Sequence, residues 1–155
     1  MPTRMLAAAA LVLITTATAT VAAAGDPGRQ YYGDAAGNPA APPFSQAVLV
    51  GDTLYVAGHI GLDPKTQQAV AGVDAEARAV MDATKAAVEA AGFHMDDLVS
   101  VTIYCTDLDL YDGFNAIYRG YFHGHFPARA FIGINRLVRG AHFEIAAVAT
   151  RAPAP

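Results

Sequence analysis

Hydrophobic and polar residues follow a regular pattern from residue 46 onward, and the pattern begins with two strand-like runs. Residues 46–50 and 53–57 are apolar and rich in β-branched side chains, which is typical of strands. Gly51 and Asp52 lie between the two runs. A two-residue connection with Gly first favours a type II′ turn, so this segment is predicted to form a β-hairpin.

Two later segments show helical periodicity. Residues 74–91 place one set of small and apolar side chains on a single face, namely Ala77, Val80, Met81, Thr84, Val88 and Ala91. Asp74 is predicted to cap the start of this helix and Gly92 to end it. Residues 112–122 carry an aromatic stripe at helical spacing, consisting of Phe114, Ile117, Tyr118, Tyr121 and Phe122. Such a stripe packs in a core more often than it binds a cofactor, so it is predicted to be core.

Three further strands complete the expected fold. Residues 98–106 alternate, with Val99, Val101, Ile103 and Cys105 on one side, and residues 130–134 and 143–150 are also strand-like. Residues 58–72 are predicted to be a loop. The order ββαβαββ predicts an α+β domain in which two helices cover one face of a mixed sheet. Because the last strands are apolar on both faces, the uncovered face indicates an oligomer.

The first 24 residues differ from the rest of the chain. Arg4 precedes an Ala- and Leu-rich run, and three alanines end at Ala24, before Gly25. This layout predicts a signal peptide cleaved near Ala24, with an uncleaved membrane anchor as the alternative. Cleavage implies a periplasmic or secreted protein with no membrane attachment.

Composition divides the remaining chain and limits its partners. Residues 25–43 are rich in Gly, Pro and Ala and are predicted to be a flexible arm, followed by one domain at 44–151 and a tail at 152–155. The formal net charge of −4 and the scattered basic residues offer no electrostatic footprint for nucleic acid. A polynucleotide partner is therefore not expected.

Several common chemistries lack their motifs. No P-loop, GxGxxG or Ser-His-Asp order is visible, and no cofactor is predicted. His123 and His125 could suggest a metal site, but they have no third ligand at useful spacing, so no metal is predicted. Cys105 is the single cysteine, which excludes an internal disulfide and favours a small buried hydrophobic residue. His142 is predicted to lie at the surface.

Three blocks of sequence together resemble a known family. They are PFSQAVLVGDTLYVAGHIGLDPKT at 43–66, FNAIYRGYF at 114–122 and FPARAFIGINRLVRGAHFEIAAVA at 126–149. In this order and spacing they are similar to the RidA/YjgF proteins, which are enamine/imine deaminases. The resemblance implies a chorismate-mutase-like fold and a homotrimer with three clefts between neighbouring subunits.

The resemblance also implies roles for three residues. Arg129 matches the arginine that binds the substrate carboxylate, Glu144 matches a glutamate that helps to position or activate water, and Asn115 matches an asparagine that lines the cleft. From the residues alone, other interpretations stand beside these. Arg129 could extend into solvent from the end of a strand, Glu144 could be an exposed position of an alternating strand, and Asn115 could be a solvated helix position.

The chain departs from the family pattern at three positions near this site. Phe44 stands where Tyr is common, Ala57 where Ser is usual, and Phe131 where many relatives have Cys. A lost hydrogen bond costs about 0.5–1.5 kcal/mol, so these changes affect the identity of the substrate more than the existence of a site. Gly58 and His59 follow Ala57 in the segment that resembles a cleft wall. His59 is hypothesised to supply a polar group to substrate or water.

The implied activity is hydrolysis of small imino or enamino acids, such as 2-aminoacrylate, to 2-keto acids and ammonia. An arginine matches a planar carboxylate bidentately, and such imines need neither a metal nor a strong nucleophile. A non-catalytic protein that binds small carboxylic acids in the same cleft is the alternative. A protein-interaction module is a further alternative, for which the sequence offers no positive feature.

Overall fold

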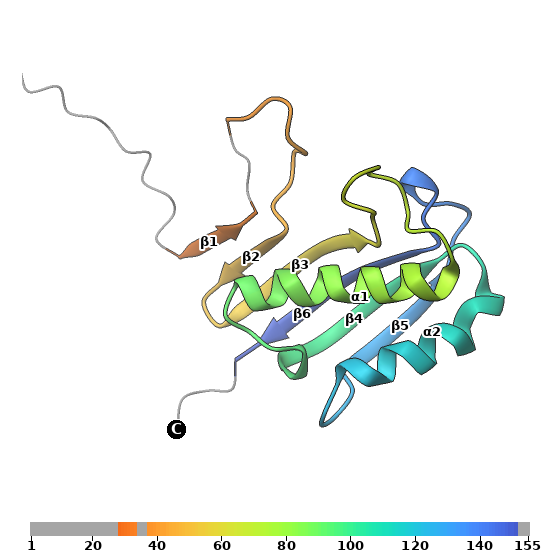
Figure 1. Ribbon diagram of the computed structural model, residues 1–155. Helices are drawn as coiled ribbons and strands as arrows, with labels where there is room; N and C mark the ends of the chain where they lie inside the picture. The colour runs from red at the N-terminus through yellow and green to blue at the C-terminus, as the bar shows by residue number, and fades with distance from the viewer. Residues whose placement is uncertain (1–27, 34–36, 152–155) are drawn as a thin grey trace, which may run out of the picture.

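The computed structural model describes residues 28–33 and 37–151, and these form one mixed sheet covered by helices (Figure 1). The strands are β1 (Arg29–Tyr32), β2 (Ala47–Val50), β3 (Thr53–Ile60), β4 (Leu98–Cys105), β5 (Ala128–Gly133) and β6 (Phe143–Thr150). The helices are α1 (Val73–Ala90) and α2 (Tyr111–Tyr118), with short 3-10 turns η1 (Met95–Asp97), η2 (Leu108–Leu110), η3 (Arg119–Tyr121) and η4 (Val138–Gly140).

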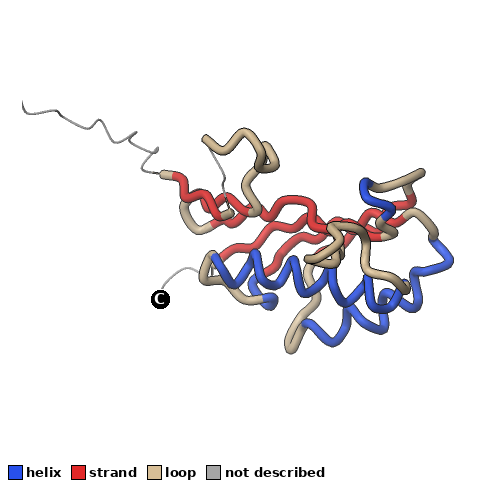
Figure 2. Tube along the Cα trace, turned by 45° about the horizontal axis from the view of Figure 1, so that its top comes forward, coloured by secondary structure: helices blue, strands red, loops and turns tan. Residues whose placement is uncertain are grey.

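The described part of the sheet has the order β1-β2-β3-β6-β4-β5. The β4–β5 pair is parallel and every other pair is antiparallel. A parallel pair needs a crossover, and α2 lies in the connection between β4 and β5. Both helices lie on one face of the sheet (Figures 1 and 2). The predicted α+β architecture, with two helices on one face of a mixed sheet, is confirmed.

The core lies between the helices and the sheet. Strand β6 alternates as a half-buried strand should, with Phe143, Ile145, Ala147 and Ala149 buried. The whole predicted apolar face of α1 is buried, and Phe114, Ile117 and Tyr118 of the aromatic stripe are buried with it. Cys105 is also fully buried, and burial raises the pKa of its thiol. Most of the predicted core is therefore confirmed, while Tyr121 and Phe122 are only partly buried.

No helix in the described part of the chain covers the opposite face of the sheet (Figure 1), which carries exposed apolar side chains as well as Ser100, Thr102 and Glu144. Tyr55 pairs with Val148 on this face and is 53% exposed, and Ile132 at the β5 edge is 41% exposed. Small side chains such as Ala130 and Ala146 occupy positions between them. An uncovered apolar surface of this kind is typical of a subunit interface.

One carboxyl group, in the first turn of α1, is enclosed in the core, and the sequence pattern did not predict its burial. Glu76, in the first turn of α1, is 1% exposed and accepts hydrogen bonds from the backbone N–H groups of His142 and Phe143. Its other oxygen lies 2.7 Å from Nδ1 of His142. The prediction that His142 lies at the surface is correct only in part, because its side chain is 45% exposed while its ring contacts the carboxylate that joins α1 to β6.

Several boundaries differ from the prediction. Strand β1 lies within the predicted flexible arm and pairs with β2. Strand β3 continues through Ile60, so the predicted loop begins three residues later. Helix α2 ends at Tyr118 and is followed by η3 near Gly120, a residue that weakens helices. The hairpin agrees with the prediction, because Gly51 has a φ of 58° and Val50 pairs with Thr53.

Two local predictions are wrong for identifiable reasons. The β4–β6 register shifts between Leu98 and Ser100, so Leu98 is buried and Val99 is 45% exposed instead of facing the core. Helix α1 begins one residue before Asp74, which therefore lies in the first turn, while Gly72 occupies the cap position without a side-chain bond. Gly92 follows the helix with a φ of 74°, as expected for its end.

The predicted signal peptide, residues 25–27 and 34–36 of the predicted arm, and the tail at 152–155 lie outside the described residues. Within residues 28–33 and 37–151, no helix combines the length and the apolar character needed to cross a membrane.

Candidate active site

Arg129 lies inside β5, which begins two residues before the predicted strand. In the parallel β4–β5 pair it is opposite Val101, and Phe131 is opposite Ile103. Both β4 residues are fully buried on the helix side of the sheet. The register therefore directs the Arg129 side chain toward α2 rather than along the sheet into solvent.

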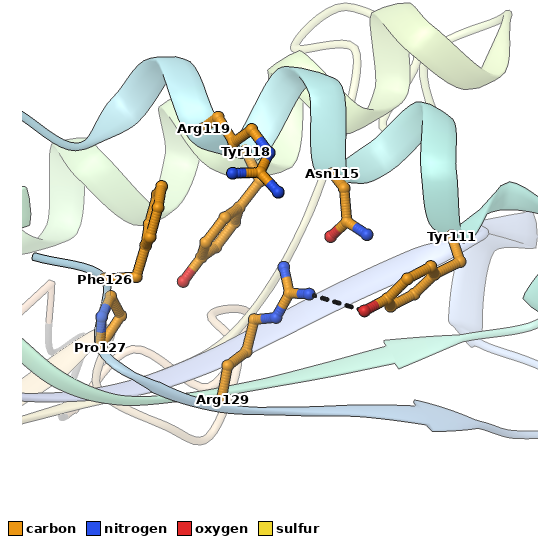
Figure 3. Close-up of a pocket in the computed structure, with 7 residues that line it drawn as sticks. All are labelled: Tyr111, Asn115, Tyr118, Arg119, Phe126, Pro127 and Arg129. Atoms are coloured by element: carbon orange, nitrogen blue, oxygen red, sulfur yellow. Dashed lines mark hydrogen bonds between the residues drawn. The ribbon is translucent and has the colours of Figure 1, made fainter.

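A pocket of about 200 Å³ opens between α2 and β5 at this point. It is lined by Tyr111, Asn115, Tyr118, Arg119, Phe126, Pro127 and Arg129, here called the arginine pocket. Figure 3 shows Arg129 extending from the strand toward the helix, which contributes Tyr111, Asn115 and Tyr118 from above. Residues 11 to 18 positions apart in sequence thus meet at one site.

Aromatic rings surround the Arg129 guanidinium. Its central carbon lies 4.7 Å from the centre of the Tyr118 ring and 5.8 Å from those of Tyr111 and Phe131. One nitrogen is 3.5 Å from the Tyr111 hydroxyl. Among the described residues, no carboxylate forms an ion pair with Arg129. A half-buried guanidinium held by rings, with most of its N–H donors free, is suited to receive an anion.

Tyr118 adds a second unfilled polar group to the pocket. The residue is 3% exposed, and its hydroxyl has no hydrogen-bond partner in the described part of the protein. Burial raises the pKa of Tyr118 to about 12, although the charge of Arg129 acts in the opposite direction. The hydroxyl therefore keeps its proton at neutral pH. Buried hydroxyls are normally bonded, so an unpartnered one beside a free cation favours a ligand site.

Two predicted site residues besides Arg129 lie at the arginine pocket. Asn115 points from α2 toward the space above Arg129 (Figure 3). Phe131 packs beside Arg129, and its ring centre lies 5.0 Å from that of Tyr111 and 5.6 Å from that of Phe114. Phe131 therefore fills space and supports the cage, but offers no polar atom to a ligand.

Glu144 and two other predicted residues lie on the opposite face of the sheet. Glu144 pairs with Tyr104, one position from the buried Ile145, so its side chain points away from the helices. The β3–β6 register shifts between Val56 and His59, which places both Ala57 and Gly58 in a bulge. A Cβ at Gly58 would collide with the Glu144 carboxylate. This group, Ala57, Gly58 and Glu144, is here called the glutamate patch.

One protomer therefore does not bring Arg129 and Glu144 together. It also separates His59 from the glutamate patch, because His59 pairs with Ile145, whose side chain faces the core. Burial lowers the pKa of His59, a hydrogen bond with the Gln46 backbone opposes this, and Nε2 is buried without a partner in the described region. Phe44 is exposed in the segment before β2.

Sequence reasoning missed five pocket residues, of which Phe126 and Pro127 were noted only as part of a family block. Tyr111 was not singled out, Tyr118 was assigned to the core alone, and Arg119 was not considered. Tyr111 and Tyr118 are seven residues apart and so lie on one helix face, which is the signal that could have found them. Arg119 follows in η3, where the helix has tightened.

In the part of the chain that the structure describes, acidic and histidine side chains do not gather elsewhere into a metal-like site. Within residues 28–33 and 37–151, no three or more His, Cys, Asp and Glu side chains are placed to hold a metal ion. Nδ1 of His123 lies 3.4 Å from Oδ2 of Asp96 at the surface.

Comparison with known proteins gives a consistent result. A family model described as Endoribonuclease L-PSP matches residues 35–151. A human 2-iminobutanoate/2-iminopropanoate deaminase is 39% identical over 112 residues, covering 72% of this chain and 82% of that protein. The E. coli YjgF gene product has a similar structure, with a TM-score of 0.69, 37% identity, and coverage of 73% and 91% of the two chains. E. coli TdcF, solved with bound serine, has the same TM-score at 31% identity, covering 73% of this chain and 91% of TdcF.

The matched region includes every strand and helix from β2 to β6, and both the arginine pocket and the glutamate patch lie within it. The chain therefore belongs to the endoribonuclease L-PSP family, the family of the RidA/YjgF proteins.

Proposed function

We propose that this protein hydrolyses small imino acids to 2-keto acids and ammonia. The observation that carries the proposal is the half-buried Arg129, which has aromatic rings around it, an open pocket before it and no ion-pairing carboxylate among the described residues. An imino acid bears a carboxylate beside the reactive carbon. A relative with 39% identity is named as a deaminase of such compounds, which supports the same reaction here.

The complete site forms between two copies of the chain. Arg129 lies near the β5 edge on the helix side, whereas the glutamate patch lies on the uncovered face. A neighbouring copy that approaches this edge can add its patch to the arginine pocket. The apolar uncovered face supports such an assembly, and a homotrimer is the arrangement that the family resemblance implies.

Arg129 holds the carboxylate with parallel N–H···O bonds and thereby fixes the position of the C=N carbon. Asn115 and the Tyr118 hydroxyl offer further hydrogen bonds from the helix above. Because the guanidinium remains charged at all working pH values, this anchoring does not depend on a protonation step.

Glu144 of the neighbouring copy handles the water. A water oxygen forms a bond to the imine carbon while one of its protons passes, through the carboxylate, to the imine nitrogen. In the resulting carbinolamine the hydroxyl proton leaves in the same way and is delivered to nitrogen. The C–N bond then breaks, ammonia departs and the C=O bond of the keto acid forms.

A coupled assay tests this function. An amino-acid oxidase generates the imine of alanine, and ammonia release is followed with and without the purified protein. Arg129→Ala is expected to lower kcat/KM about 10- to 100-fold, because it removes a charge-assisted bidentate bond. Arg136→Ala, at an exposed loop position, is the matched control.

Three outcomes are distinct. Faster ammonia release that depends on Arg129 supports the deaminase. Binding of pyruvate without any acceleration overturns it in favour of the carboxylate binder. If the protein neither accelerates ammonia release nor binds pyruvate, the protein-interaction module is the remaining alternative.

We also propose that the chain is exported and processed near Ala24. The support is the charged start, apolar run and small residues before Gly25. Expression of the full chain in a bacterial host should place it in the periplasm with Gly25 at its N-terminus, as read by mass spectrometry. Retention of Met1 in the cytoplasmic fraction would contradict export.

A further inference from the structure

We infer that the arginine pocket selects imino acids with a second carboxylate, such as those derived from glutamate or aspartate. The inference rests on the proposed function and adds the class of substrate. Its basis is a second cation in the pocket, Arg119, which has no role in anchoring the first carboxylate.

Arg119 and Arg129 reach the pocket from different elements. In Figure 3, Arg119 comes from the helical segment above the pocket and Arg129 from the strand below it. The Arg119 guanidinium lies 5.6 Å from the centre of the Phe126 ring, which lines the same space. In the described residues no carboxylate pairs with Arg119, so its donors also remain available.

The lining of the pocket has two positive charges and no acidic side chain. A monocarboxylate compensates one charge and leaves the other without a partner. A dicarboxylate compensates both, because one end is bound by Arg129 and the distal end by Arg119. The pocket volume of about 200 Å³ equals roughly seven water molecules at about 30 Å³ each, which is more than one carboxylate fills.

The remaining lining favours an extended chain between the two charges. The rings of Tyr118 and Phe126 line the pocket beside the arginines (Figure 3), and these suit methylene groups of a substrate. The same rings could bind an apolar substrate, such as the imine of leucine. The two unpaired cations favour the dicarboxylate, because an apolar side chain would leave Arg119 uncompensated.

The test compares three imines generated by oxidases, namely those of glutamate, alanine and leucine. We expect kcat/KM for the glutamate imine to exceed both others by about fivefold at low salt. A ratio of this size corresponds to the interaction free energy of one exposed charge pair. Arg119→Gln is expected to remove this ratio and Arg119→Glu to reverse it. Arg136→Gln, an exposed arginine outside the pocket lining, is expected to preserve it. High salt should reduce the ratio.

Equilibrium binding of 2-oxoglutarate and pyruvate, followed by NMR titration, gives a second measurement that needs no turnover. Tighter binding of 2-oxoglutarate that is lost in Arg119→Gln supports the inference even if no imine is hydrolysed. Arg129-dependent hydrolysis with equal or better use of the alanine or leucine imine, unaffected by Arg119→Gln, overturns the inference and leaves the proposed function intact.

Discussion

Glu76 and Arg129 are two charged residues in the layer between the helices and the sheet, and they differ in how many of their polar atoms are hydrogen-bonded. Glu76 is 1% exposed, accepts two backbone N–H bonds, and lies 2.7 Å from a ring nitrogen of His142. Arg129 is half-buried, has one contact of 3.5 Å to a hydroxyl, and is otherwise surrounded by aromatic rings.

The difference separates a structural charge from a functional one. A buried carboxylate must have its oxygens satisfied, and Glu76 has partners that fix α1 against β6. Arg129 has five N–H donors and uses few of them, which stabilises the fold little but leaves capacity for a ligand. Free hydrogen-bonding capacity beside a pocket, rather than charge alone, therefore marks the candidate site.

The largest expected effect is on stability at Glu76. Glu76→Ala is expected to lower the free energy of unfolding by about 3 kcal/mol, because it leaves two buried N–H donors without acceptors. Denaturant unfolding measures this. Glu89→Ala is the matched control in the same helix, since Glu89 is exposed and only pairs with Lys85, and a change within about 0.5 kcal/mol is expected. Equal losses in the two variants would show that Glu76 has no special structural role.

The next effect is on binding at Arg129. Arg129→Met keeps an apolar stem against the rings but removes the charge, so pyruvate binding is expected to weaken about 10- to 100-fold. The free energy of unfolding should change by about 1 kcal/mol or less. NMR titration and denaturant unfolding provide the two measurements. A variant that unfolds easily and still binds pyruvate would reverse the assigned roles of Glu76 and Arg129.

A smaller effect is expected at the glutamate patch. The backbone of Gly58 has no positive φ, but an added Cβ meets the Glu144 carboxylate, so Gly58→Ala should displace that group without unfolding the chain. Turnover of an alanine imine is expected to fall about tenfold, the change that corresponds to about 1.4 kcal/mol. Pyruvate binding should remain close to that of the unaltered protein. A fall in both measurements together would argue against a separate role for Glu144.

Tyr118 tests whether its unpartnered hydroxyl behaves like Arg129 rather than like Glu76. Tyr118→Phe keeps the ring over the guanidinium and removes a buried hydroxyl that has no partner within the described residues. Stability should therefore stay constant or rise by about 1 kcal/mol, while pyruvate binding weakens about threefold. A loss of stability, measured by denaturant unfolding, would show that the hydroxyl is bonded in solution.

The smallest effect concerns His59. It is half-buried, and its Nε2 has no partner within the described residues, as most Arg129 donors have none. Burial lowers its folded pKa below the ordinary 6.5, so the unfolded chain binds more protons between the two values. The stabilising contribution of neutral His59 is therefore complete above about pH 6.5 and is lost as pH falls through the folded pKa. His59→Gln should lose less stability than the unaltered protein between pH 7 and pH 5. Parallel pH curves for the two proteins would contradict this.

Much of the architecture could be predicted from periodicity alone. The buried face of α1 and that of β4 from Val101 to Cys105 are read directly from apolar spacing, because each side chain direction there follows from local geometry. The errors occur where geometry is not local. The bulge beside Leu98 reverses the exposure of Val99, and β1 is a strand because β2 offers it a partner, not because its own sequence is strongly strand-like.

By itself, the sequence determined the element types, the core faces, the family resemblance and the residues Arg129, Asn115 and Glu144 as candidates. Only the tertiary structure decided that Arg129 faces α2, that Tyr111, Tyr118 and Arg119 join it, and that Glu144 lies on the other side of the sheet. The physical reason is that strand pairing sets which face each side chain occupies. Register is a relation between distant segments, whereas periodicity is a property of one segment.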